Sequence, residues 1–165
     1  MELLVSTDWL SREMGADDLC IIDATRHHFE PARDARAEYL AGHIAGSLFL
    51  DMEALVDKAS PIENTLPTAG QFTQAMRALG IDSDKRIVIY DDSIVKTAAR
   101  AWFMFELFGL KKVAMLDGGL AKWKAEGRPL ESGMVKSASG AFTASKFTAS
   151  KDASALRSKA EVLQN

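Results

Sequence analysis

The sequence predicts an α/β fold in which a mainly parallel sheet is covered by helices on both faces. Short apolar runs alternate along the chain with longer amphipathic stretches, and the clearest runs lie at residues 19–22, 87–90 and 113–116. Strands that are apolar at every position are typical of parallel sheets buried on both sides. Ligands of such folds bind at the carboxyl ends of the strands, so the segments after these three runs are the places to search.

The first part of the chain predicts one helix and two strands. Ser6 or Thr7 caps a helix whose apolar residues recur at helical spacing. Residues 19–22 form a buried strand, and the polar stretch 24–36 forms a surface loop with a short turn of helix after it. The apolar run 47–50 predicts the second strand.

The middle of the chain continues the alternation. Residues 57–67 contain two prolines and predict a loop, and the helix that follows starts at Thr68 and stops at Gly80. Strand, helix, strand and helix then follow in turn at residues 87–90, 98–108, 113–116 and 120–127.

The composition changes near residue 132, where Ser, Ala, Lys and Gly begin to dominate. The pentapeptide Phe-Thr-Ala-Ser-Lys occurs twice, at 142–146 and at 147–151, and is too short to be a solenoid repeat. We therefore predict a domain at 1–131 and a linker at 132–152. Residues 153–165 have a helix-like apolar pattern and predict the start of a further unit.

Composition excludes several classes of protein. The chain has 165 residues, and its net charge of −3 argues against nucleic-acid and anionic-membrane partners. Cys20 is the only cysteine, which excludes an intramolecular disulfide and cysteine-based zinc sites. His27, His28 and His43 show no metal-binding spacing, so we expect no metal. We expect a cytoplasmic protein, because no apolar run is long enough to span a membrane and the amino terminus does not resemble a secretory signal.

The loop after residues 87–90 begins with adjacent acids, Asp91 and Asp92. A phosphoryl-accepting aspartate of the haloacid-dehalogenase type requires an Asp-x-Asp spacing that is absent here. A receiver domain would place paired acids after its first strand, whereas about 85 residues precede this one. The alternative without catalysis is that the two acids cap the following helix, since acids are favoured at helix starts by about 0.3–1 kcal/mol.

Other nucleophiles and cofactor loops have little support. Cys20 lies inside an apolar run, and a buried thiol has a raised pKa and little reactivity. The chain has no G-x-S-x-G nucleophile elbow and no glycine-rich phosphate loop, so no cofactor is expected.

Several segments, in order, resemble one known family. Residues 39–47 are similar to the rhodanese motif aromatic-x-x-x-His-Ile-Pro-Gly-Ala, with Ala45 in place of Pro and Ser47 in place of Ala. Residues 116–123 resemble the second motif of that family, an Asp-Gly-Gly turn followed by Trp. Tyr90-Asp91 with residues 99–105, and the segments 49–55 and 60–67, fit the amino-terminal domain of two-domain thiosulfate/3-mercaptopyruvate sulfurtransferases. The motif residues with a structural role would be His43, Gly46, Asp117, Gly118 and Gly119.

The resemblance implies a rhodanese-like domain with a mostly parallel five-stranded sheet. In the family, a cysteine in the carboxyl-terminal domain ends the central strand, sits in a cradle of backbone N–H groups, and takes sulfur from thiosulfate or 3-mercaptopyruvate. The matching position here is Asp91. An aspartate cannot form a persulfide, and its charge beside Asp92 would repel an anionic donor. The chain is therefore expected to be the catalytically silent half, with no catalytic residue of its own.

The resemblance also implies residues that face the cleft between the two domains. The family's acidic residue matches Glu53, and its histidine matches Asn64, which cannot shuttle a proton near neutral pH. Glu53 could equally be a solvated acid at a helix start. Arg100 could face the cleft or pair with a local acid. His43 is expected to fix the turn into the strand at 47–50.

Three functions remain open at this stage. The first is the amino-terminal half of a sulfurtransferase, truncated or working with a carboxyl-terminal rhodanese domain in cis or in trans on a small-molecule sulfur donor. The second is a binding or regulatory module that has kept the fold and lost the cysteine. The third is weak activity through Cys20. A severed domain should expose an apolar patch where its partner docked, in residues 49–66 and after Asp91.

Overall fold

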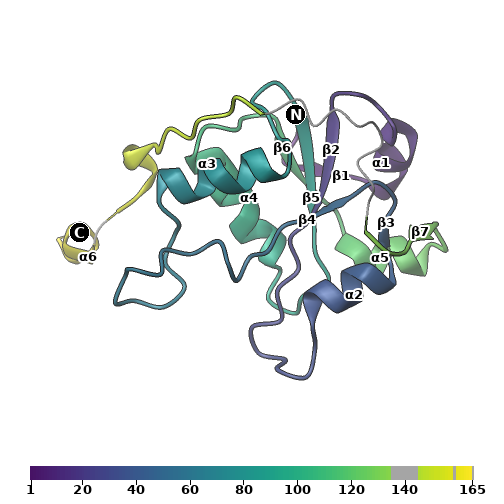
Figure 1. Ribbon diagram of the computed structural model, residues 1–165, viewed down its shortest axis with the longest axis horizontal. Coiled ribbons are helices and arrows are strands. Elements are labelled where there is room, and N and C mark those ends of the chain that lie inside the picture. The colour runs from purple at the N-terminus through teal and green to yellow at the C-terminus, as the bar shows by residue number, and fades with distance from the viewer. Residues whose placement is uncertain (135–144, 158, 165) are drawn as a thin grey trace.

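A computed structural model describes residues 1–134, 145–157 and 159–164. At its centre is a five-stranded sheet in the order β1-β6-β5-β2-β4, in which every neighbouring pair of strands is parallel (Figure 1). The predicted fold class and strand number are confirmed. The strands of this sheet are β1 (Leu4–Val5), β2 (Leu19–Asp23), β4 (Leu48–Phe49), β5 (Arg86–Tyr90) and β6 (Val113–Leu116).

Two further strands form a small antiparallel sheet. They are β3 (His43–Ile44) and β7 (Leu130–Glu131), and His43 lies opposite Glu131 in their register. Neither strand, nor β1, was predicted, because each has only two residues and shows no periodicity. β4 is equally short, but it lies within the apolar run 47–50. Each depends on the neighbouring strand that supplies its hydrogen bonds.

The first three helices begin at residues whose side chains cap them. The hydroxyl of Ser6 accepts a hydrogen bond from the backbone N–H of Trp9 at the start of the first helix. Thr68 and Gln71 form a reciprocal capping box at the third. The helices are α1 (Thr7–Glu13), α2 (Ala35–Ala41), α3 (Ala69–Ala78), α4 (Thr97–Leu107), α5 (Gly119–Ala125) and α6 (Lys159–Leu163).

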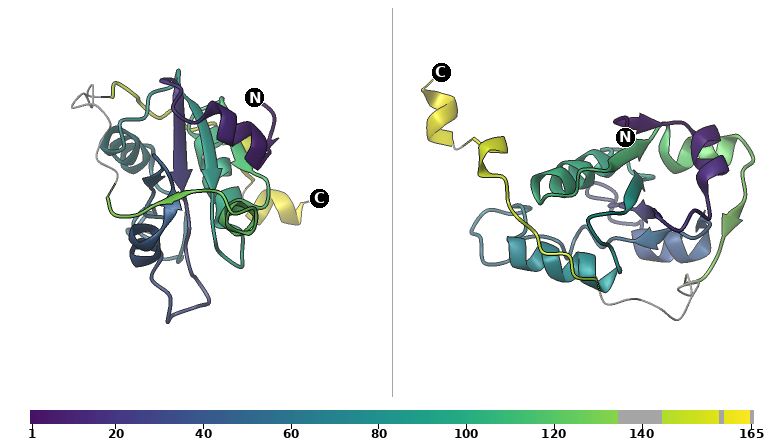
Figure 2. Two further views of the ribbon diagram at one scale, coloured as in Figure 1. Left: turned by 90° about the vertical axis from the view of Figure 1, so that its right-hand side faces the viewer. Right: turned by 90° about the horizontal axis from the view of Figure 1, so that it is seen from above.

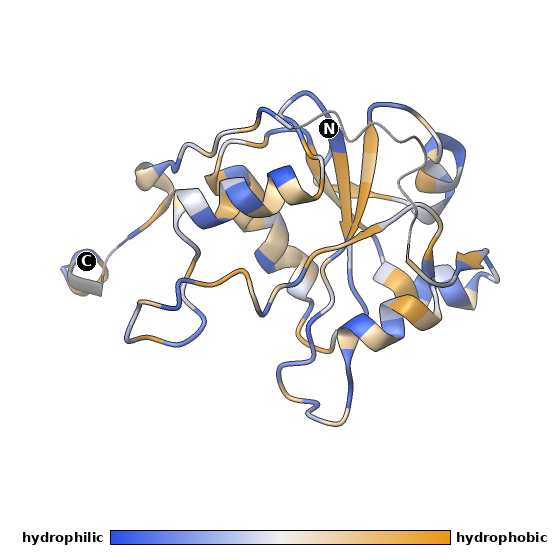
Figure 3. Ribbon diagram, in the orientation of Figure 1, coloured by the Kyte–Doolittle hydropathy of each residue, from blue (hydrophilic) through white to orange (hydrophobic). Residues whose placement is uncertain are grey.

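Side chains alternate across the sheet and divide the core into two layers. Ile87 and Ile89 of β5 pack with residues of α3 and α4 in one hydrophobic cluster. Val88 and Tyr90, on the other face, pack with residues of α1 and α5. Figure 2 shows helices on both faces of the sheet, and Figure 3 shows that the central strands are hydrophobic along most of their length. Burial on both faces explains why these strands read as continuous apolar runs.

Part of the predicted linker packs against the domain. Residues 135–144, with most of the first pentapeptide copy, lie outside the described part of the chain. In the second copy, Phe147 is buried and contacts the ring of Phe72. The guanidinium of Arg77 donates to the carbonyl oxygen of Phe147 at 2.8 Å, and the N–H of Ala149 donates to the hydroxyl of Thr73 at 2.9 Å. The domain boundaries stay predictions, but this stretch extends the core.

The end of the chain has few partners. Leu156 packs partly against the core, whereas Val162 and Leu163 of α6 are largely exposed. Figure 2 shows α6 standing apart from the sheet. Among the residues that the structure describes, no helix has the length and apolar character needed to cross a membrane.

Candidate functional site

The acid that follows β5 is buried in a hydroxyl-lined loop. The carboxylate of Asp91 accepts hydrogen bonds from the hydroxyls of Ser93 and Thr97, the latter at 3.3 Å. Its backbone carbonyl accepts the N–H of Leu120, the second residue of α5, at 3.0 Å. The loop is thus organised around a fixed negative charge at the carboxyl end of the central strand. Sequence reasoning missed Ser93 and Thr97, although their spacing of two and six residues from Asp91 was available as a signal.

The expectation that Asp91 and Asp92 cap α4 is wrong. The residue before α4 is Lys96, in a left-handed conformation with φ 55°, and the hydroxyl of Ser93 accepts the N–H of Thr97 at 3.0 Å. Asp92 instead pairs with Lys124 of α5, at 3.3 Å, because the helix starts four residues further along the chain than a cap would require.

Glu53, Asn64 and Arg100 lie in one region, but only two of them touch directly. A guanidinium nitrogen of Arg100 donates to the backbone carbonyl of Asn64 at 2.7 Å and to that of Thr65 at 3.2 Å. Arg100 therefore clamps the loop before α3 rather than pairing with an acid. Asn64 has φ 55°, a left-handed conformation that asparagine tolerates better than most residues.

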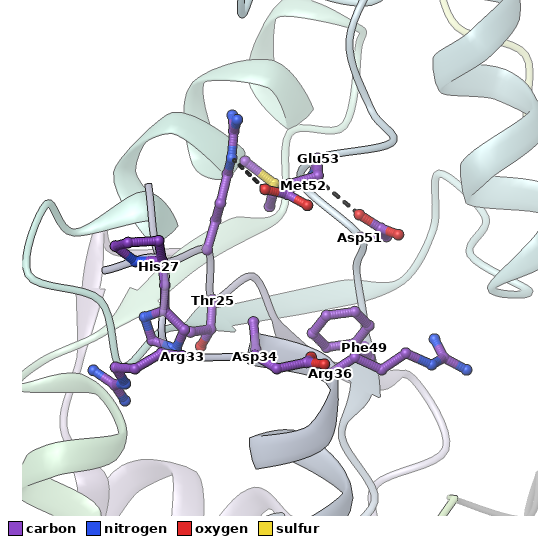
Figure 4. Close-up of a pocket in the computed structure, with 12 residues that line it drawn as sticks. Thr25, His27, Arg33, Asp34, Arg36, Phe49, Asp51, Met52 and Glu53 are labelled. Carbon is purple, nitrogen blue, oxygen red and sulfur yellow. Dashed lines mark hydrogen bonds and ion pairs between the residues drawn. The ribbon is translucent and has the colours of Figure 1, made fainter. Parts of the chain in front are cut away.

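Glu53 contacts a residue that sequence reasoning missed, Arg26. Its carboxylate lies 3.8 Å from the Nε atom of Arg26, which is buried and has no hydrogen-bond partner in the described structure. Burial, and then the nearby charge of Arg26, lower the pKa of Arg100. Both Arg26 and Glu53 line a pocket of about 440 Å³ beside α2, with Asp51 and Glu53 on the side of it opposite Arg33 (Figure 4).

The first motif of the sequence folds as a structural unit. His43 is fully buried, its Nδ1 donates to the carbonyl oxygen of Tyr39 at 2.7 Å, and its ring stacks on that of Tyr39. Gly46 has φ 73°, and its N–H donates to the carboxylate of Glu131 at 3.0 Å. The hydroxyls of Ser47 and Tyr90 are hydrogen-bonded to each other at 2.8 Å, which ties this turn to the central strand.

The second motif forms the turn from β6 into α5. Gly118 and Gly119 both have positive φ, at 78° and 56°. A Cβ atom on Gly119 would lie 2.5 Å from the backbone oxygen of Asp91, so only glycine allows α5 to approach the loop after β5. The carboxylate of Asp117 pairs with Lys122 at 2.6 Å on the surface.

Cys20 lies on β2 at the opposite, amino-terminal end of the sheet from Asp91. Its side chain is half-buried against the core, and burial raises its pKa, with the positive charge of Lys85 opposing. A raised pKa leaves little thiolate at neutral pH, so this thiol has the character of an inert structural residue.

Asp23 is a second buried acid that sequence reasoning did not single out. Burial raises its pKa, opposed first by the hydrogen bond from Thr25. The folded state therefore binds this proton more tightly than the unfolded state does, and stability falls as pH rises from about 3.9 through the raised pKa. We expect Asp23→Asn to remove this fall, because the amide oxygen still accepts the N–H of Thr25.

The measurement is the free energy of unfolding in urea between about pH 2 and pH 7, which covers the titration of both acids. Asp18 provides a control of opposite sign, since its hydrogen bond to Arg86 lowers its pKa. The ionised carboxylate of Asp18 stabilises the folded state above the pKa that it has in the unfolded chain, and this stabilisation is lost in acid. Asp18→Asn should remove it. A slope unchanged by Asp23→Asn would show that Asp23 does not titrate differently in the two states.

In the residues that the structure describes, no three His, Cys, Asp or Glu side chains gather in a way that could hold a metal ion.

Comparison with known sequences identifies the kind of domain. The model of the rhodanese-like domain matches residues 6–126. The chain is 41% identical over 141 residues to a 3-mercaptopyruvate sulfurtransferase of Escherichia coli K12, covering 85% of this chain and 50% of that protein. It is 40% identical over 136 residues to a thiosulfate sulfurtransferase of Bos taurus, covering 78% of this chain and 45% of the relative. The chain thus spans about half the length of these curated relatives.

A solved structure agrees with the sequence comparison. The crystal structure of SseA from Escherichia coli, described as a 3-mercaptopyruvate sulfotransferase with the rhodanese fold, superposes with a TM-score of 0.89 and 36% identity. The match covers 99% of this chain and 61% of that one. The length of the match, the motifs around His43 and Gly119, and the parallel sheet agree: this chain belongs to the rhodanese-like domain family.

Proposed function

We propose that this chain is the amino-terminal, non-catalytic half of a sulfurtransferase that moves sulfur from thiosulfate or 3-mercaptopyruvate to cyanide or a thiol. The catalytic cysteine would be in a second rhodanese-like domain. That domain would join this one in cis or in trans. The relatives that carry these activities by name are about twice as long as the match, which supports a two-domain unit.

The observation that carries the proposal is the carboxylate at the end of β5. Asp91 occupies the position at which the family pattern has its nucleophile, and Ser93 and Thr97 hold it in place by hydrogen bonds. A carboxylate cannot accept a sulfur atom to become a persulfide, as a cysteine thiolate does. Asp92 adds a second negative charge beside it. Together they disfavour an anionic sulfur donor at this loop. Cys20 lies at the opposite end of the sheet and would not replace the missing nucleophile.

Exposed apolar side chains in two loops support docking of a partner domain. Ile62 is 69% exposed, Ile94 is 62% exposed and Val95 is 44% exposed. Ile94 and Val95 follow Asp91, and Ile62 lies in the loop that Arg100 clamps. These are the two segments in which the sequence predicts a docking patch, and exposed apolar side chains in both of them favour a protein interface.

In the assembled enzyme, Glu53 and Arg100 would act from the cleft. Glu53 would present a negative charge toward the partner's cysteine, with Arg26 beside it. Arg100 would hold the loop at Asn64 in the shape that closes the cleft. Asn64 would contact substrate by hydrogen bonds and transfer no proton, because an amide does not titrate near neutral pH.

We expect the isolated chain to form no thiocyanate above the blank, with thiosulfate or 3-mercaptopyruvate as donor and cyanide as acceptor. Adding a separately purified carboxyl-terminal rhodanese domain from the Escherichia coli relative should raise the rate above that of the added domain alone. Cys20→Ser should leave both results unchanged. Turnover by the isolated chain that disappears in Cys20→Ser would overturn the proposal.

A pair of surface variants separates docking from folding. Ile94→Asp should abolish the gain from the added domain while leaving the free energy of unfolding within about 0.5 kcal/mol, since the side chain is exposed. Leu3→Asp is the control, because Leu3 is similarly exposed but precedes β1 at the amino-terminal edge of the sheet. If the added domain has no effect on any form, the chain is better described as a stand-alone binding or regulatory module.

A further inference from the structure

Two buried acceptor atoms face one another in the segment between β2 and α2. The side chain of His27 is only 2% exposed. Its Nδ1 atom and the Oε2 atom of Glu30 lie 3.5 Å apart, and both are buried without a hydrogen-bond partner in the described structure. With a neutral imidazole whose proton is on Nε2, two lone pairs would face each other here, away from water. Such an arrangement is unfavourable unless a proton lies between the two atoms.

The other ring nitrogen of His27 is already committed. Nε2 lies 2.9 Å from the carboxylate of Glu38, on α2, and a carboxylate only accepts. Nε2 must therefore carry a hydrogen to make this bond. A proton on Nδ1 as well makes the ring an imidazolium, which donates to Glu38 from one side and to Glu30 from the other.

The balance of charge around the ring points the same way. Arg33 donates to both oxygens of Glu38, at 2.8 and 2.7 Å, and to Glu30 at 3.3 Å. Two carboxylates and one guanidinium leave a net negative charge, which an imidazolium cancels. Outside this cluster, Asp92 lies 3.8 Å from Arg33 and is itself paired with Lys124 of α5, and Arg26 precedes His27 in the chain and pairs with Glu53.

We infer that His27 is held as an imidazolium between Glu30 and Glu38. This arrangement, called the clasp below, is a latch that holds residues 26–33 in place in a pH-dependent way. Arg33, which this clasp holds, lines both the pocket beside Glu53 and the pocket beside Asp92. This inference concerns the chain itself and does not depend on the proposed sulfurtransferase function.

The sign of the pH dependence follows from the groups involved. The clasp requires a charged His27 and ionised Glu30 and Glu38. It is lost as pH rises and His27 releases its proton, since Nδ1 then faces Glu30 unpaired. It is also lost in strong acid, where the carboxylates become protonated. The hydrogen bond from Arg33 lowers the pKa of Glu38, which extends the closed range toward acid.

The direct test is the protonation state of His27 in the intact chain, read from imidazole ¹⁵N chemical shifts by NMR. We expect both nitrogens of His27 to be protonated at pH 7. His28, which is its neighbour and packs edge-on against Phe29, serves as the internal reference. An unprotonated Nδ1 on His27 at pH 6 would overturn the inference, and this measurement needs no variant.

Variants test the latch itself. Amide exchange in residues 26–33, corrected for its intrinsic pH dependence, should speed up about tenfold or more as His27 loses its proton, since one charge-assisted hydrogen bond is lost. In Glu30→Gln, the side-chain amide donates to a neutral Nδ1, so exchange should stay slow at high pH. His27→Gln should remove the pH dependence, and His28→Gln should retain it. The same pH dependence in wild type and His27→Gln would rule the latch out.

Discussion

Replacing Phe72 by alanine is expected to lower the free energy of unfolding by about 3–5 kcal/mol. Phe72 is fully buried on α3 and stands at the centre of an aromatic cluster. Its ring centroid lies 5.4 Å from that of Phe105, 4.6 Å from that of Phe108 and 6.1 Å from that of Phe147. The variant loses both the transfer free energy of the ring and the contacts around the cavity that it leaves.

The measurement is urea unfolding followed by tryptophan fluorescence. Phe29→Ala is the matched control, because Phe29 is 67% exposed and its loss should change stability by no more than about 0.5 kcal/mol. The docked stretch around Phe147 should loosen together with the core in Phe72→Ala. Equal effects of the two substitutions would mean that the aromatic cluster is not part of the cooperative core.

Gly119→Ala is expected to lower the free energy of unfolding by about 2–4 kcal/mol. The residue has φ 56°, which by itself is unfavourable for alanine. In addition, the new Cβ would lie 2.5 Å from the carbonyl oxygen of Asp91, a backbone atom that cannot rotate away. Relief of the clash breaks the hydrogen bond from Leu120 to that carbonyl, and so separates α5 from the loop after β5.

Gly127→Ala isolates the backbone contribution. Gly127 has a similar φ of 67°, but no atom lies within 4 Å of the position of its Cβ. Its substitution should therefore lower stability by only about 1–2 kcal/mol. A loss in Gly119→Ala no larger than that in Gly127→Ala would show that the close approach to Asp91 contributes nothing. Amide shifts of the Asp91 loop should change only in Gly119→Ala.

The strands at the centre of the sheet were predictable because a strand buried on both faces is apolar at nearly every position. β2, β5 and β6 are runs of apolar residues, and the starts of α1 and α3 carry side chains that cap helices. The packed position of Phe147 was not predictable. Its neighbours are small and polar, as in a linker, and its partners lie about 40 to 75 residues away along the chain.

Some features of the candidate site were likewise predictable from the sequence, and others were not. That an aspartate, Asp91, follows the central strand could be predicted from the sequence, because position relative to a strand is a local property. The partner of Arg100 could not, since it is a pair of backbone carbonyls in a loop 35 residues earlier. The same holds for Arg26, whose neighbours in the sequence give no sign that Glu53 lies beside it.

Composition and periodicity thus sufficed to predict the fold class and to exclude an intramolecular disulfide. Both depend on residue type and on spacing within one element. The arrangement of charge around His27, the hydroxyls that hold Asp91 and the close approach of Gly119 came from contacts between segments far apart in the chain. Such contacts depend on how strands are ordered and helices packed, and no local pattern of residues records that order.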